Sequence, residues 1–299
     1  MKMRFEISTS NFAPLCEEEF KRRKNQPGYL EAVQFEHYQI ATQQQLGPSK
    51  HFLKKENERK NRYRDILCWD ETRVKITPQK DDTDYIHANY VDSFGIPKKY
   101  VATQGPLEKT IEQFWQMIWE QNSRIIVMLT ELYIAGKEKC APYWYTHESE
   151  QQTFKTGEFS IKTVNEERKS GYVETIFDVC HCTTGERKQI KHYLYSDWPD
   201  HGVPSKCHSF MKLILTVNKE RQQLLTEMAD GLAPGPIIVH CSAGVGRTGT
   251  FCAVDSCLHQ LAKTRTISVP ETLMNIRKQR YFSLMVPEQY IYAVSYTHL

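Results

Sequence analysis

The sequence predicts an α/β protein in which a single domain holds a highly twisted, mixed β-sheet flanked by α-helices. Two observations predict this fold. Strand and helix signals alternate from about residue 60 onward, and no Gly/Ser-rich linker divides them into two domains. Some strand segments are apolar throughout, as buried strands are, whereas others alternate apolar and polar residues, as strands with one wet face do.

The first well-marked elements are a helix followed by a strand. Apolar side chains at positions 111, 114, 115, 118 and 119 recur with the helical period, and Thr110 stands where such a helix would begin. Residues 125–129 are apolar without interruption, which is typical of a buried strand. The spacing therefore predicts a helix over 111–119 that runs into a strand of the core.

Farther along, period-two alternation over residues 157–163 and 172–181 predicts an antiparallel pair of strands. Apolar residues at 210, 213, 214 and 217 predict another helix. Three potential metal ligands, Cys180, His181 and Cys182, alternate across the second of these strands, so we interpret them as non-ligating.

Composition excludes several classes of protein. The 39 basic and 36 acidic residues leave a net charge of +3, too mild to indicate a nucleic-acid partner. No apolar run reaches the ~18 residues of a membrane span, and the acidic N-terminal region lacks the apolar core of a signal peptide. Nine cysteines without a framework spacing indicate reduced thiols. We therefore expect a cytoplasmic protein.

The N-terminal part carries the weakest signals. We expect residues 1–34 to form an extension, helical and packed on the domain, and residues 35–299 to form the domain itself. The basic stretch over residues 54–62 is interpreted as a solvated helix face or loop.

The most informative segment is PIIVHCSAGVGRTGT at residues 236–250. An apolar strand ends at His240, a loop of small residues follows, and a helix then begins whose inward stripe includes Phe251 and Val254. A Gly-rich loop at a helix N-terminus aims several backbone N–H groups at one point, where the helix dipole is positive. This arrangement predicts a nest for a doubly charged oxyanion such as phosphate.

The same loop also satisfies the dinucleotide-binding fingerprint through Gly244, Gly246 and Gly249. That fingerprint needs an acidic residue ~20 positions on to hold ribose, and residues 263–270 contain no carboxylate. The remaining chain is also too short for the other strands of a dinucleotide fold. A dinucleotide site has no use for a cysteine that opens the loop or an arginine that closes it, so we disfavour this interpretation.

Cys241 and Arg247 explain the loop better. A thiol at a helix N-terminus beside a guanidinium is expected to be a thiolate at neutral pH, which is an activated nucleophile. Arg247 offers a planar fork that matches two phosphate oxygens, and Thr248 can donate its hydroxyl to the sulfur. An inert buried thiol is instead the better interpretation of Cys252 and Cys257.

The string VHCSAGVGRTG at residues 239–249 resembles the signature of the tyrosine-specific protein phosphatases. Further motifs are similar to those of this family and stand in its order: KNRYRD at 60–65, DYIHAN at 84–89, ATQGP at 102–106, KCAPYW at 139–144 and WPDHGVP at 198–204. The resemblance covers roughly residues 35–299. It implies a catalytic domain that hydrolyses phosphotyrosine in proteins through a phosphocysteine intermediate, with no cofactor and no metal.

The resemblance also implies roles for single residues. Asp200, on a loop that includes Trp198 and closes over the substrate, would be the general acid. Gln289 matches the second of two glutamines in the family's last motif and would substitute for the first, which orients the hydrolytic water. Tyr63 would stack on the substrate ring in a cleft too deep for phosphoserine, and Asp65 would hold the substrate backbone. The remaining substrate-binding positions are Lys139, Ser242, Ala243, Gly244, Val245 and Gly246.

The match departs from the family pattern at three places. Met285 stands where the family has the first of two glutamines in its last motif, and a thioether cannot orient the hydrolytic water. Ile134 stands where the family commonly has a Glu that pairs with the loop arginine, and Glu131 or Glu138 would have to replace it. His87 takes the place of the usual Asn.

Two functions follow from these matches and departures. One is an active phosphatase of phosphotyrosine proteins, with a hydrolytic step slowed by Met285. The other is a phosphotyrosine-binding or substrate-trapping protein of the same fold. The compact chain and its altered last motif are similar to phosphatases carried by insect viruses of parasitoid wasps, which would place it in the host-cell cytoplasm. We expect a monomer.

Overall fold

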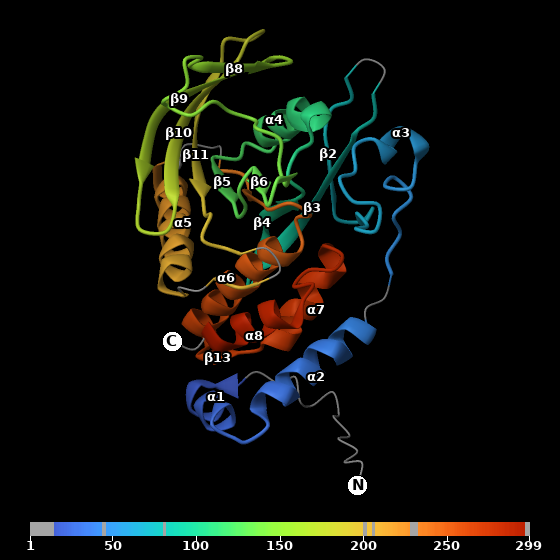
Figure 1. The fold of residues 1–299 in the computed structure, drawn as a ribbon, viewed down its shortest axis with the longest axis vertical. Coiled ribbons are helices and arrows are strands. Elements are labelled where there is room, and N and C mark those ends of the chain that lie inside the picture. Colours follow the sequence, from blue (N-terminus) through green and yellow to red (C-terminus); the bar gives the residue numbers. More distant parts are fainter. Residues whose placement is uncertain are drawn as a thin grey trace.

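A nine-stranded mixed sheet forms the centre of the molecule (Figure 1). The computed structural model describes residues 15–43, 46–79, 82–199, 202–204, 207–227 and 233–296. The strand order is β2-β3-β4-β12-β5-β11-β10-β9-β8. The strands are β2 (Arg73–Lys75), β3 (Tyr85–Ser93), β4 (Ile96–Thr103), β5 (Ile125–Met128), β8 (Thr153–Thr156), β9 (Phe159–Arg168), β10 (Val173–His181), β11 (Arg187–Leu194) and β12 (Ile237–His240).

Helices flank this sheet, and two further pairs of short strands lie outside it. The helices are α1 (Glu17–Lys24), α2 (Tyr29–Thr42), α3 (Lys55–Glu58), α4 (Ile111–Glu120), α5 (Cys207–Glu227), α6 (Gly246–Thr264), α7 (Val269–Gln279) and α8 (Pro287–Tyr296). The short strands are β1 (Leu15–Cys16) with β13 (Thr266–Ile267), and β6 (Tyr133–Ile134) with β7 (Lys137–Glu138). The predicted fold class, a single α/β domain with a mixed sheet flanked by helices, is confirmed.

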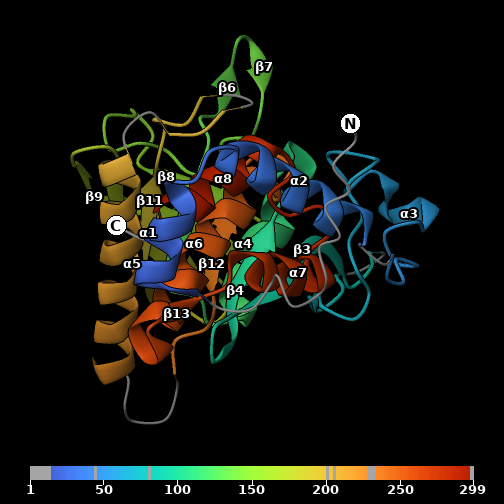
Figure 2. The same ribbon diagram turned by 90° about the horizontal axis from the view of Figure 1, so that it is seen from below.

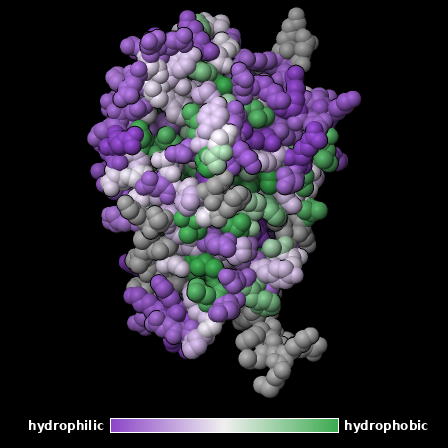
Figure 3. Space-filling view, viewed as in Figure 1, coloured by the Kyte–Doolittle hydropathy of each residue, from purple (hydrophilic) through white to green (hydrophobic). Residues whose placement is uncertain are grey.

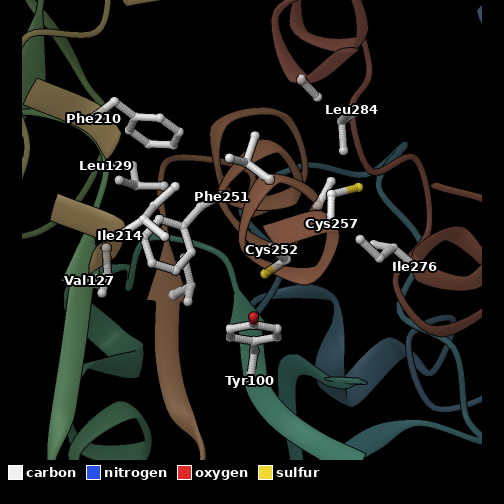
Figure 4. Packing of buried hydrophobic residues seen from close by; sticks show 14 of the residues in the cluster. Tyr100, Val127, Leu129, Phe210, Ile214, Phe251, Cys252, Cys257, Ile276 and Leu284 are labelled. Atoms are coloured by element: carbon white, nitrogen blue, oxygen red, sulfur yellow. The ribbon is translucent and has the colours of Figure 1, made fainter. Parts of the chain in front are cut away.

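The central strands β5 and β12 are buried on both faces, which explains why they are apolar throughout, whereas β9 alternates buried and exposed residues. In β12, Ile237 and Val239 belong to a core shared with α5, α6, α7 and α8, whereas Ile238 belongs to a core shared with α4. β12 pairs in parallel with β4 on one side and β5 on the other. Figure 4 shows the first core, where Tyr100 and Phe251 lie near the predicted buried thiols Cys252 and Cys257.

The elements predicted from periodicity are present. The helix expected over 111–119 is α4, and the strand expected over 125–129 is β5. The two alternating segments form β9 and β10, which pair antiparallel. The interpretation of residues 54–62 as solvated is wrong for Lys60, which is 3% exposed. Its Nζ pairs with Asp82 at 2.8 Å and donates to the Tyr85 carbonyl at 3.1 Å, so burial is compensated by partners.

The N-terminal helices pack against the C-terminal ones. Helix α2 contacts α7 and α8, and Figure 2 shows it lying across them. The sequence predicts a division between extension and domain at residue 34, which lies within α2. This division stays a prediction. Residues 1–14 lie outside the described part of the chain.

Hydrophilic residues cover most of the face seen in Figure 3, with hydrophobic residues scattered among them. Within the described residues, no helix combines the length and the apolar character that crossing a bilayer requires.

Leu213 and Leu215 provide a test of the core on α5, because Leu213 is fully buried whereas Leu215 is 61% exposed. Leu213→Ala should lower the free energy of unfolding by about 2–5 kcal/mol, since it leaves a cavity. The matched control Leu215→Ala should change it by no more than about 0.5 kcal/mol. Urea denaturation followed by tryptophan fluorescence measures both values. Equal losses of unfolding free energy in the two variants would contradict the conclusion that α5 packs on the sheet through the face that carries Leu213.

Candidate active site

The segment over residues 236–250 folds as its sequence predicts. β12 ends at His240 and α6 begins at Gly246, with a tight loop between them. We call residues 241–247 the phosphate loop. Gly244 in this loop has φ +71°, and a Cβ there would lie 2.1 Å from the Thr103 carbonyl oxygen. Only glycine therefore fits this position, both for its backbone conformation and for its space.

Cys241 lies at the bottom of the loop and is 5% exposed. Its Sγ accepts a hydrogen bond from the Gly244 N–H at 3.2 Å, and the N-terminus of α6 follows directly. The hydroxyl of Thr248 is buried without a hydrogen-bond partner among the described residues, so its expected bond to the sulfur stays a prediction.

Arg280 explains why the loop presents its amides inward. This guanidinium is completely buried and donates from Nε to the Gly244 carbonyl at 3.0 Å and from Nη2 to the Ala243 carbonyl at 3.1 Å. In a planar trans peptide the N–H points opposite to the C=O. Each carbonyl that turns toward Arg280 therefore turns the next residue's N–H the other way, and the Gly244 N–H indeed reaches Cys241 Sγ.

His87 and Asn89 of β3 complete the surroundings of Arg280. Nη1 of Arg280 donates to Asn89 Oδ1 at 2.8 Å, and Nη2 lies 3.1 Å from His87 Nδ1. His87 Nε2 lies 2.8 Å from the Ile66 carbonyl, which can only accept, so the proton is on Nε2 and Nδ1 accepts from Arg280. Burial and the nearby Arg280 lower the pKa of His87 to about 3, so the imidazole is neutral. A neutral His can thus occupy the position of the usual Asn.

Arg247 is held by main-chain carbonyls. Its Nη1 donates to the Leu129 carbonyl at 3.2 Å and its Nη2 to the Pro199 carbonyl at 3.3 Å. The second contact brings the loop that begins at Trp198 to the phosphate loop. Trp198 itself is buried and donates from Nε1 to the Gly202 carbonyl at 2.7 Å. Asp200, the expected general acid, lies outside the described residues.

Ile134, which stands where the family commonly has a Glu, lies in β6. The hairpin of β6 and β7 projects at the edge of the molecule (Figure 2). Glu138, one of the two carboxylates considered as a substitute, pairs with Arg62 Nη2 at 3.0 Å. Arg62 also donates to the Gly105 and Pro106 carbonyls. Glu138 therefore links the hairpin to the segment that carries Tyr63.

A cavity of about 230 Å³ opens above Cys241. It brings together most of the side chains predicted to act there. The predicted residues that line it are Tyr63, Asp65, Lys139, Cys241, Ser242, Ala243, Val245, Gly246, Arg247 and Gln289, and Met285 and Val286 line it as well. Gly244, Trp198 and Thr248 do not line it. At the wall, the Tyr63 hydroxyl and Ser242 Oγ are 2.9 Å apart.

Gln289, on α8, packs against the phosphate loop. A Cβ built on Gly246 would lie 3.0 Å from both Nε2 and Oε1 of Gln289. Oε1 is buried and has no hydrogen-bond partner among the described residues. Gln289 thus lines the cavity and carries a buried acceptor that is unsatisfied. Met285 and Val286, one turn earlier, contribute apolar wall instead.

Sequence reasoning missed the chain of side chains beneath Cys241. His240 Nδ1 donates to the Cys241 carbonyl at 3.2 Å, which leaves Nε2 to accept from the Tyr143 hydroxyl at 2.9 Å. His192 Nε2 then donates to the same hydroxyl at 2.8 Å. All three side chains are buried. They fix the end of β12 from which the phosphate loop starts.

Comparison with known proteins gives consistent matches. Residues 57–298 match the family model described as protein-tyrosine phosphatase. Tyrosine phosphatase H3 of Microplitis demolitor bracovirus is 37% identical over 294 residues, covering 92% of this chain and 90% of the relative. Tyrosine phosphatase H2 of the same virus is 37% identical over 291 residues, covering 96% and 88%. Human tyrosine-protein phosphatase non-receptor type 9 is 38% identical over 242 residues, covering 79% of this chain and 40% of that protein.

The buried histidines near the site predict an acid-sensitive fold. Burial lowers the pKa of His87 and His192 to about 3 and that of His240 to about 4. Below pH ~6.5 these histidines become protonated in the unfolded chain but stay neutral in the native state until the pH approaches their lowered pKa values. For each of them the free energy of unfolding therefore falls by about 1.4 kcal/mol per pH unit as the pH is lowered. Urea titrations between pH 7 and 4 measure this fall. His192→Gln should reduce the slope of the free energy of unfolding against pH by the contribution of one proton, about 1.4 kcal/mol per pH unit. An unchanged slope would contradict the assignment of His192 as a buried, neutral histidine.

Proposed function

The chain belongs to the protein-tyrosine phosphatase family, and on that premise we propose that it dephosphorylates tyrosine in proteins through a phosphocysteine intermediate on Cys241. One observation carries this proposal. The Cys241 sulfur lies under an inward-facing amide of the phosphate loop, at the N-terminus of α6, and Arg247 shares its cavity. Nucleophile and anion site therefore coincide, as phosphoryl transfer to a thiolate requires.

In the first step the Cys241 thiolate attacks phosphorus, so that an S–P bond forms as the bond from phosphorus to the tyrosyl oxygen breaks. We assign Asp200 the delivery of a proton to that oxygen. Arg247 and the amides of residues 242–246 stabilise the charge on the transferring phosphoryl group. The contact between Arg247 and the Pro199 carbonyl supports this assignment, because it holds the residue before Asp200 beside the phosphate loop.

Substrate selection rests on the cavity walls. Tyr63 is proposed to stack on the substrate ring, Asp65 to hold the peptide backbone, and Lys139 to contact the anion or the closed loop that includes Trp198. The hydrogen bond between Tyr63 and Ser242 supports this role for Tyr63, because it holds the ring upright at the wall of the cavity. The depth of the site favours phosphotyrosine over the shorter phosphoserine and phosphothreonine.

In the second step water attacks the phosphocysteine and gives a proton to the Asp200 carboxylate that the first step leaves. The S–P bond breaks, and the thiolate and phosphate are released. We propose that Gln289 orients this water through Oε1, whose lack of a partner among the described residues supports the assignment. Thr248 is proposed to donate to the departing sulfur. Met285 can neither orient the water nor donate to the sulfur, because a thioether has no hydrogen to donate and accepts only weakly.

A substrate-trapping function remains the second candidate, and one observation favours it. Met285 and Val286 put apolar surface on the cavity wall next to Gln289, so a single amide has to position the water. In that case the chain would bind phosphotyrosine proteins and release phosphate slowly. Under either function we propose a monomeric, cytoplasmic protein whose partners are phosphotyrosine proteins and not nucleic acids.

Cys241→Ser should abolish the release of inorganic phosphate from a phosphotyrosine peptide, by about 10³-fold or more, because the nucleophile is lost. Binding of the peptide should persist, since the amides and Arg247 remain. The matched control is Cys182→Ser, which alters an exposed thiol and should leave the rate unchanged. Phosphate release at the same rate from both variants would refute catalysis by Cys241.

Rapid mixing with an aryl phosphate should give a burst of phenol followed by slower steady turnover, because formation of phosphocysteine is intact while its hydrolysis is slow. Met285→Gln should raise the steady rate. Gln289→Ala should lower it by up to about 10²-fold, since the water loses its orientation. A time course without a burst would argue against slow hydrolysis, and no effect of Met285→Gln would mean that Gln289 already suffices.

A further inference from the structure

The loop between α7 and α8, residues 280–286, has an unfavourable backbone at two positions. Phe282 has φ +62° and Leu284 has φ +50°, and neither is a glycine. Side chains with a Cβ avoid this left-handed region, so such residues persist only where their surroundings hold them. The loop ends in Met285 and Val286 on the cavity wall and leads into α8, whose third residue is Gln289.

Leu284 is held at both of its backbone groups. Its N–H donates to the carbonyl of Val245 in the phosphate loop at 3.1 Å. Its carbonyl accepts from Nη2 of Arg277 at 3.1 Å and contacts Nε2 of His37 at 2.9 Å. The side chain is fully buried in the core seen in Figure 4. The contact with His37 comes from α2, which lies outside the residues that match the family model.

His37 is built into this position. It is 5% exposed, and its ring lies 5.5 Å from that of Tyr290 on α8. The next residue toward the N-terminus, Glu36, accepts from the Tyr290 hydroxyl. Nε2 of His37 lies 2.9 Å from the Leu284 carbonyl, which only accepts, and 3.1 Å from Nη2 of Arg277, which only donates. We assign the proton of His37 to Nε2 on the shorter contact, so that His37 and Arg277 both donate to the Leu284 carbonyl. The bond therefore depends on a donor at that nitrogen and not on the shape of the ring alone.

We propose that His37 is a positioning residue for hydrolysis of the phosphocysteine. It holds the Leu284 carbonyl and thereby fixes the loop that leads to Gln289 against the phosphate loop. This inference rests on the proposed function and assigns part of it to the N-terminal helix α2. The first step is independent of His37, because Arg280 and Tyr63 hold the phosphate loop from other sides.

The test compares His37→Leu, which removes the donor, with His37→Gln, whose amide nitrogen can replace Nε2. Tyr38→Ala is the matched control, because Tyr38 is the next residue of α2 and is 64% exposed. With an aryl phosphate, His37→Leu should keep the rate of the phenol burst within about twofold and lower steady turnover by roughly 10-fold. His37→Gln should recover most of that loss, and Tyr38→Ala should behave as the unmodified chain.

Hydrogen–deuterium exchange supplies a readout apart from activity. The Leu284 amide should exchange faster in His37→Leu than in His37→Gln or Tyr38→Ala, because its hydrogen bond to Val245 opens more often. Equal loss of burst and turnover, no rescue by Gln, or unchanged exchange would overturn the proposal. A failed proposed function gives a different result, because the Cys241→Ser variant would then retain the phosphate release of the unmodified chain.

Discussion

The site depends on one buried cation that never meets the substrate. Arg280 binds the Ala243 and Gly244 carbonyls from behind the phosphate loop and so decides which side of the loop carries the amides. A buried guanidinium is costly unless its N–H groups are satisfied. Asn89 and a neutral His87 meet that requirement from β3, and His87 in turn binds the Ile66 carbonyl. The anion site and the segment that carries Tyr63 and Asp65 thus share one hydrogen-bond network.

The sequence was sufficient wherever the signal is local. The apolar strand, the small-residue loop and the helix after it are contiguous, so the position of Cys241 follows from residues 236–250 alone. That Tyr63, Lys139 and Gln289 lie around Cys241 was predicted from the family motifs and not from any local pattern in the sequence. Their arrival in one cavity depends on the order of the strands, which periodicity does not fix.

What could not be predicted is long-range. Arg280 reaches partners 36, 191 and 193 positions away, and His37 reaches Leu284 across 247 positions. No spacing rule relates such pairs. Lys60 illustrates the opposite error, because a basic stretch in a polar segment is usually solvated, yet Asp82 and the Tyr85 carbonyl make burial favourable here.

The place of β12 in the sheet also governs how the protein is made. β4 and β5 are separated by β12, which comes from residues 237–240 and pairs with both of them. During synthesis the edges of β4 and β5 that pair with β12 therefore stay unpaired until residue 240 has left the ribosome. The reactive cysteine follows at once, and its loop is shaped only when Arg280 has emerged. The nucleophile is thus assembled late, and the nascent chain is open to mispairing until then.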